Sequence, residues 1–144
     1  MSVERPHIPL HIRRRVEEDS RYRCGYFLTA RTFTAKLLHI EHIIPIAAGG
    51  GSEIENLWLA CDLCNSHKGT RTNAVDLLTG LTVPLFHPRQ QSWSEHFSWS
   101  QAGTHILGLT SIGRATVYAL KLNDAFLVEA RRWWVKAGWH PPVD

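Results

Sequence analysis

The feature that most constrains the fold is a short run in which apolar, glycine-rich and helix-like segments follow one another. Residues 37–46, LLHIEHIIPI, are rich in Leu and Ile and end near a proline, which predicts a strand with proline at its exit. The next stretch, AAGGGS, predicts a turn, and residues 57–61 predict a second short strand. From Asp62 the pattern becomes helical and ends near Gly69. Residues 37–69 therefore hold a strand, a glycine loop, a strand and a short helix.

Helix and strand patterns flank this run on both sides. Residues 9–23 have apolar positions at weakly helical spacing, which predicts an N-terminal helix with arginines on its outer face. Residues 76–89 contain a Thr-Gly turn and two prolines and predict an extended connection. Residues 96–110 alternate on both sides of SQAGT and predict a hairpin. Two further helices are predicted over residues 110–121 and 123–137.

Together these patterns predict an α+β fold with a strand–strand–helix core, an N-terminal helix, and a C-terminal hairpin plus two helices. A chain of 144 residues is long enough for one domain with one core. We therefore expect a single domain over residues 1–144. In it, residues 71–144 form an α+β extension packed on the 37–69 motif.

Composition argues against several classes of protein. Hydrophobic residues make up 44% of the chain, with six Trp, which argues against a disordered protein. No apolar run reaches the roughly 18 residues that a membrane span needs. The start, MSVERPHIPLHIRRRV, lacks an apolar signal region and a small-residue cleavage site. We expect a cytoplasmic protein with no membrane partner, and the sequence leaves the oligomeric state open.

The basic charge is concentrated in the N-terminal quarter. Residues 1–36 hold eight Lys and Arg against four Asp and Glu, whereas residues 37–144 hold eight against nine. Part of the excess lies in the consecutive Arg13, Arg14 and Arg15. A basic arm on a nearly neutral body suits contact with a polyanion. On charge alone, however, a solvated helix face is the simpler interpretation.

The cysteines point to metal or redox chemistry. Three cysteines cannot form a fully paired disulfide framework. Cys61 and Cys64 form a Cys-x-x-Cys pair, which in a cytoplasmic chain more often indicates a metal site or a redox pair. The βαβ context expected of a redox pair is absent, so a redox role is disfavoured.

Glu41 and His42 are an unusual pair on an apolar strand. Neighbouring strand residues point to opposite faces, but at a strand end beside a loop both side chains can still reach one site. A carboxylate oxygen holds a divalent cation, and a neutral imidazole takes a proton from water. The pair therefore suits metal-assisted hydrolysis.

The ordered set EHIIP, GG and ENLWLACDLCNSHKG resembles the HNH endonuclease family with its ββα-metal (His-Me finger) fold, in particular the small stand-alone prokaryotic type. The resemblance implies that His42 is the general base and that Glu41 is the carboxylate ligand of the catalytic metal, where Asp is commoner. It implies that Asn56 ties the glycine loop to the motif and orients the base. These three residues with Asn65 make up the implied catalytic set.

The same resemblance assigns roles on the helix. Asn65 takes the place of the last metal ligand, so this chain is an H-N-N version of the motif. His67 is a possible second ligand or phosphate contact. Lys68 would also face phosphate. The implied nucleic-acid contacts are Lys68, Arg71, Arg13, Arg14 and Arg15.

The implied activity is metal-dependent hydrolysis of DNA phosphodiester bonds, with one Mg²⁺, or Mn²⁺ or another divalent ion in its place. RNA stays open as a substrate. Activity should fall below the ordinary imidazole pKa near ~6.5, because the base must be neutral. Two alternatives stay open: a non-cleaving nucleic-acid-binding module on the same scaffold, and a zinc-type interaction domain.

In zinc-bearing HNH proteins a second Cys-x-x-Cys, often CxYC, precedes the first strand. Here the matching stretch is CGYF, so Cys24 fits and Phe27 stands in place of the fourth thiolate. Structural zinc is nearly always four-coordinate. Cys24, Cys61 and Cys64 could hold zinc with a water or a nearby His, or the site could be metal-free with Phe27 packed among buried cysteines.

The segments PLFHPRQQSWSEHFSW and GLTSIGRATVYAL resemble the tail of the same small HNH proteins. The resemblance assigns no catalytic role to this tail. Its polar residues His87, Arg89, His96 and Arg114 are either ordinary surface residues or a nucleic-acid contact surface.

Overall fold

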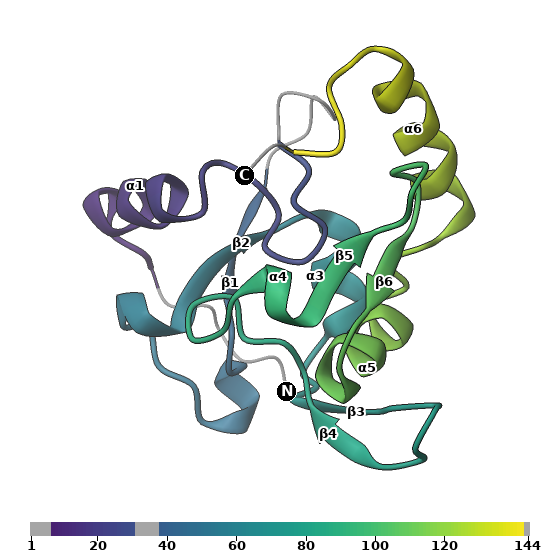
Figure 1. The fold of residues 1–144 in the computed structure, drawn as a ribbon. Coiled ribbons are helices and arrows are strands. Elements are labelled where there is room, and N and C mark those ends of the chain that lie inside the picture. The colour runs from purple at the N-terminus through teal and green to yellow at the C-terminus, as the bar shows by residue number, and fades with distance from the viewer. Residues whose placement is uncertain (1–6, 31–37, 143–144) are drawn as a thin grey trace. The chain divides into compact units, whose positions relative to one another are not determined.

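The structure is a computed structural model that describes residues 7–30 and 38–142 (Figure 1). This part of the chain is mixed α and β, with five α-helices, two short 3₁₀ helices and three two-stranded antiparallel sheets. The chain divides into two compact units, Met1–Thr72 with His87–Gln90, and Asn73–Phe86 with Gln91–Asp144. The α+β class is as expected, and the packing of residues 71–144 on the motif stays a prediction.

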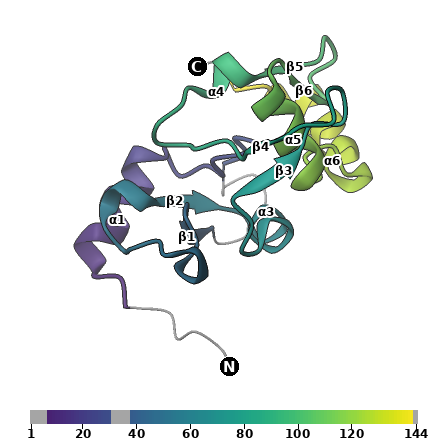
Figure 2. The same cartoon turned by 90° about the horizontal axis from the view of Figure 1, so that it is seen from below.

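The first unit contains the predicted strand–strand–helix run. Strand β1, His39–His42, pairs antiparallel with β2, Leu57–Ala60, and helix α3, Asp62–Lys68, follows. Figures 1 and 2 show α3 beside this hairpin, and α3 contacts β1. In the pairing, Glu41 lies opposite Trp58. The order predicted over residues 37–69 is therefore present, with residue 37 outside the described residues.

The N-terminal helix is shorter than the predicted 9–23. Helix α1 spans Leu10–Asp19 and ends because the backbone turns left-handed at Arg21 and Tyr22, where φ is 56° and 57°. Its buried residue Val16 joins a core cluster with apolar side chains of the hairpin. The other buried members of that cluster are Ile40, Leu57 and Leu59. This cluster fixes α1 against the hairpin that carries the candidate site.

The glycine loop between β1 and β2 depends on a close approach. Its first part is a 3₁₀ helix, Ile46–Ala48, which ends at Gly49 with φ of 92°. A Cβ atom at Gly50 would lie 1.7 Å from the Ile44 carbonyl oxygen, so only glycine allows the chain to pass there. The loop therefore returns tightly past the exit of β1.

Strand β1 ends at His42, earlier than the predicted residue 46. The reason is a side chain, because the Asn56 Oδ1 atom accepts the hydrogen bond of the Ile44 N–H at 2.8 Å. The backbone of Ile43 still donates to the Asn56 carbonyl at 2.8 Å. Beyond that point the side chain of Asn56 replaces the strand ladder, and the chain turns away.

In the described part of the second unit there are two hairpins and three helices. Strands β3, Asn73–Val75, and β4, Thr82–Pro84, form one hairpin, and β5, Phe97–Trp99, and β6, Ile106–Gly108, form the other. The helices are α4, Trp93–His96, α5, Ser111–Ala119, and α6, Ala125–Lys136. The hairpin expected over 96–110 and the two helices that follow are present.

The extended connection predicted over residues 76–89 is wrong in its first half, which is a hairpin turn. The Asp76 carboxylate accepts hydrogen bonds from the Leu78 N–H at 3.2 Å and from the Thr79 hydroxyl at 2.9 Å. Such side-chain bonds to neighbouring groups are the usual way an aspartate stabilises a turn.

Among the described residues, no helix is long and apolar enough to cross a membrane.

Candidate active site and cysteine cluster

Three of the four predicted catalytic residues, Glu41, His42 and Asn65, meet at one cavity of about 270 Å³ in the first unit. Glu41 and His42 reach it from β1, and Asn65 and Lys68 reach it from α3. The two predicted parts of the motif, separated by the glycine loop, are therefore brought together in space. The predicted Asn56 and His67 do not line this cavity.

Glu41 is a buried carboxylate with two strong partners. Its side chain is only 3% exposed. The Tyr26 hydroxyl donates to the carboxylate and lies 2.8 Å from each oxygen, and the Lys68 ammonium lies 2.8 Å from Oε1. Burial raises the pKa of Glu41, while the charge of Lys68 opposes that rise. Two groups from separate segments, Tyr26 and Lys68, thus hold this carboxylate in place.

Lys68 is also only 3% exposed, which is unusual for a lysine. Its ammonium donates to the carbonyl of Ile43 at 2.7 Å as well as to Glu41. The predicted contact with phosphate is therefore not available to this ammonium as it lies, because the group faces Glu41 inside the unit. Instead, Lys68 joins the end of α3 to the exit of β1.

His42 is half-buried and lies beside the glycine loop. Its Nε2 atom lies 3.0 Å from the Ser52 hydroxyl. Asn56 holds the two sides of this loop together, because its Nδ2 donates to Ile44 O at 3.0 Å and to Gly51 O at 2.8 Å. The loop that carries Ser52 is thereby tied to the strand end that carries His42.

The remaining predicted contacts lie on α1 and in the segment just after α3. The Arg71 guanidinium donates to the carbonyls of His67 and Lys68, so it covers the carboxyl end of α3. Arg13, Arg14 and Arg15 are all exposed on α1, which belongs to the basic N-terminal quarter of the chain. The Arg15 side chain is paired with Asp19 at 3.1 Å.

The cavity offers hard oxygen donors for a divalent cation. The Glu41 carboxylate and the Asn65 amide oxygen are the donor types that Mg²⁺ prefers. The Lys68 ammonium already neutralises the carboxylate, so a metal ion held there would share Glu41 with a positive charge. The donor types at this cavity therefore fit a divalent cation, on the condition that the cation shares Glu41 with Lys68.

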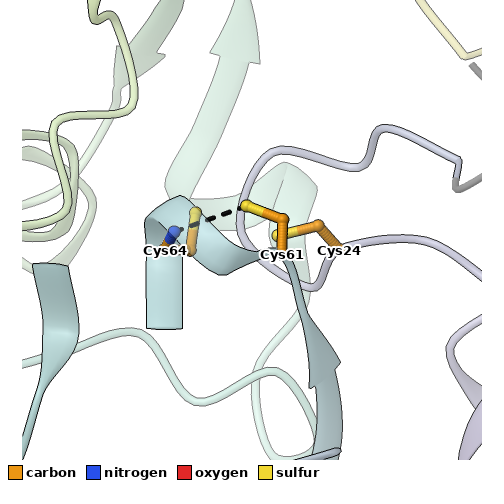
Figure 3. Close-up of side chains that lie close together, drawn as sticks. All are labelled: Cys24, Cys61 and Cys64. Carbon is orange, nitrogen blue, oxygen red and sulfur yellow. Dashed lines mark hydrogen bonds between the residues drawn. The ribbon is translucent and has the colours of Figure 1, made fainter. Parts of the chain in front are cut away.

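The three cysteines form a second cluster, shown in Figure 3. The sulfur atoms of Cys24, Cys61 and Cys64 all lie within 4.8 Å of one another. Over residues 7–30 and 38–142, this is the one group of three or more His, Cys, Asp or Glu side chains that converges as metal ligands would. Phe27, at the expected fourth position, is buried at 2% exposure. Three converging thiols fit zinc in donor type.

The cysteine cluster and the candidate site share one loop. Cys24 lies in this loop, and Tyr26, two residues later, holds Glu41. Burial and the negative charge of Glu41 raise the pKa of Tyr26, so the hydroxyl stays protonated and remains a donor. Sequence reasoning assigned no role to Tyr26, although the family pattern CxYC contains a tyrosine at this place.

Two polar residues of the tail, Arg89 and Arg114, each make hydrogen bonds or ion pairs within their own unit. Arg89 donates to Asp19 at 2.8 Å and to the carbonyl of Leu57 at 3.0 Å. Arg114 pairs with the buried Asp76 at 2.9 Å. Both arginines are therefore held by contacts within the protein.

Comparison with known families confirms the resemblance. Residues 22–71 match the family model of HNH endonuclease. The matched segment covers about a third of the chain and includes Cys24, Tyr26, the hairpin, α3 and Arg71, but not α1. The HNH family generally comprises endonucleases, so this segment indicates a nuclease-type function that involves nucleic acid.

Two further comparisons found nothing. No curated protein matches the chain, and no solved structure matches it.

Proposed function

We propose that the protein is a metal-dependent HNH endonuclease with a ββα-metal core, which hydrolyses phosphodiester bonds of DNA. The observation that carries this proposal is the cavity where Glu41, His42 and Asn65 meet. A module that only binds nucleic acid has no need for an imidazole beside a buried carboxylate at one cavity. The matched family consists in general of endonucleases.

In this proposal His42 is the general base. A neutral imidazole takes the proton of the attacking water, and the Ser52 hydroxyl at 3.0 Å from Nε2 orients the ring. Asn56 is a positioning residue, because its hydrogen bonds hold the loop that carries Ser52. The imidazole ring of His42 is thereby held in one orientation before substrate binds, which lowers the entropic cost of the reaction.

Glu41 and Asn65 would hold the divalent metal, Mg²⁺ or Mn²⁺. His67 does not line their cavity and is left out of this ligand set. When bound, this ion supplies charge stabilisation for the scissile phosphate and the leaving oxygen. Tyr26 and Lys68 fix the Glu41 carboxylate from two sides. We reassign Lys68 from phosphate contact to positioning, since its ammonium faces Glu41.

The surface around the cavity supplies the contacts to the nucleic-acid backbone. Arg71 lies just after α3 and contacts its last carbonyl, and Arg13, Arg14 and Arg15 are exposed on α1. Phosphate contacts of this kind give affinity and register without sequence preference. The cluster of Cys24, Cys61 and Cys64 would hold a structural zinc ion, with the fourth position left by Phe27 taken by a water or another donor.

One observation favours the alternative of a binding module without cleavage. The Glu41 charge is already matched by Lys68, so the carboxylate does not require a metal for its own neutralisation. One assay distinguishes the two functions, because only an endonuclease converts supercoiled DNA to a nicked form.

The test is nicking of supercoiled plasmid in Mg²⁺ or Mn²⁺ by the wild-type protein, His42→Ala and His105→Ala. His105 is exposed in the second unit, so its variant is a matched control. We expect nicking by wild type and His105→Ala, and a loss of at least about 100-fold in His42→Ala, as for removal of a general base. If wild type leaves the plasmid intact in both metals, the enzyme proposal fails. Nicking retained by His42→Ala would remove His42 as the base.

A further inference from the structure

We infer that a second cavity, on the α1 side of His42, binds the phosphate that neighbours the cleaved bond, with Arg13 as its ligand. This inference rests on the proposed function and adds a substrate subsite to it. The cavity has a volume of about 460 Å³. Its walls come from the segment around the start of α1 and from β1, both in the first unit.

The position of His42 links the two cavities. Its side chain, together with Ile40, lines both the candidate active site and this second cavity. A polymer strand that is cleaved at an internal bond beside His42 continues on both sides of that bond. The second cavity can hold the strand on one of these sides, and its volume lies in the range of roughly 300–1,000 Å³ that is usual for ligand sites.

The charge of the cavity suits an anion. Its described lining contains the Arg13 guanidinium and the imidazoles of His7 and His39, and no acidic side chain. Asp62, outside this lining, contacts His39. Apolar surface from Ile8 and Leu10 completes the lining and can cover the sugar. A phosphodiester with its sugar therefore matches the cavity in both charge and polarity.

The three consecutive arginines differ in where they lie. Successive residues of an α-helix are rotated by about 100°, because a turn has 3.6 residues. Arg13 lines the cavity, and Arg14 does not. Arg15 is held by Asp19. A guanidinium can grip a phosphate with two parallel hydrogen bonds, so Arg13 is the one of the three suited to a specific phosphate contact.

The experiment is fluorescence anisotropy with a labelled DNA duplex in buffer without added divalent metal, so that binding is measured apart from cleavage. The proteins compared are wild type, Arg13→Ala, Arg13→Lys, Arg14→Ala and Arg132→Ala. Arg132 is exposed on α6 in the second unit and serves as the control for loss of one positive charge. Each protein is titrated over a series of salt concentrations.

We expect Arg13→Ala to weaken binding about tenfold or more, as for loss of a hydrogen bond to a charged group, and to lower the salt slope by about one. Arg13→Lys should recover part of the affinity, because it keeps the charge and loses the paired hydrogen bonds. Arg14→Ala should lose less than Arg13→Ala, and Arg132→Ala should match wild type.

Equal losses in Arg13→Ala and Arg14→Ala would overturn the subsite, since they would indicate only general attraction to a basic helix. An unchanged Arg13→Ala, or a wild type that does not bind the duplex, would also overturn it. The proposed function fails separately, if wild type binds DNA but never nicks plasmid. In that result a tenfold loss in Arg13→Ala would still support the phosphate site.

Discussion

Replacing Lys68 by methionine should lower the free energy of unfolding by about 3 kcal/mol or more, because it leaves the Glu41 carboxylate buried without its counter-charge. Both side chains are 3% exposed, so solvent screens this pair very little. Methionine keeps an apolar stem as far as Cε and lacks the ammonium group of lysine. The variant therefore isolates the charge and its hydrogen bonds.

The magnitude follows from the contacts. Removing one partner of a buried ion pair costs roughly 3–5 kcal/mol, since the other charge stays uncompensated. Tyr26 still donates to both Glu41 oxygens in the variant, which moves the expected cost toward the lower end. The variant also loses the hydrogen bond from Lys68 to Ile43 O at 2.7 Å, which works in the opposite direction. About 3–4 kcal/mol is the balance of these effects.

The assay is urea unfolding followed by tryptophan fluorescence, for wild type, Lys68→Met, Glu41→Gln and the double variant. Lys136→Met, at an exposed position of α6, is the matched control and should change stability by less than about 0.5 kcal/mol. The double variant should be more stable than the sum of the two single losses predicts, by about 1–3 kcal/mol.

The pH dependence gives a second check on the same pair. Burial already raises the pKa of Glu41, and loss of Lys68 removes the charge that opposes this rise. In Lys68→Met the carboxyl group should take up a proton at higher pH than in wild type, which relieves the unpaired charge. The stability gap between the two proteins should therefore shrink as pH falls. A loss below about 1 kcal/mol at neutral pH, or strictly additive single variants, would refute a buried coupled pair.

Three further results are expected. Asn56→Ala should cost about 2–3 kcal/mol in urea unfolding and reduce nicking, because three hydrogen bonds to the loop backbone are lost, and unchanged nicking would contradict its positioning role. Burial and the charge of Arg131 lower the pKa of His140 to about 4 from 6.5, so the unfolded state binds a proton first and stability should fall by roughly 2–3 kcal/mol from pH 6.5 to pH 4. In thermal unfolding across that range, the stability of His140→Phe should depend less on pH than that of wild type. The same pH dependence in both proteins would show that His140 is not the cause. Purified protein should hold about one zinc per chain by elemental analysis, and Cys64→Ser should lose it; folded wild type without metal would show the thiols to be a buried apolar cluster.

The parts of the fold that could be predicted are those set by local pattern. The strand, glycine loop, strand and helix over residues 37–69 follow from apolar runs, Gly-rich turn chemistry and a helix that ends at Gly69, where φ is 56°. The second hairpin and the last two helices followed in the same way. The β3–β4 hairpin did not, because its turn depends on the Asp76 side chain rather than on a strong strand pattern.

The candidate site was predictable to the extent that a family motif specifies residue types at fixed spacing. Glu41, His42 and Asn65 do meet at one cavity. The environment of these residues was not predictable. Lysines near helix ends usually lie in solvent, so nothing in the local pattern of Lys68 indicated a buried pair with a residue 27 positions earlier.

The sequence by itself determined which chemical groups this protein has and the order of the elements that carry them. It determined the adjacent carboxylate and imidazole, the three cysteines and the glycine loop. Only the tertiary structure decided that Tyr26 and Lys68 close around Glu41, and that Arg13 rather than its neighbours lines the cavity beside His42. The physical reason is that burial and charge pairing depend on segments distant in the chain, whose approach no local pattern encodes.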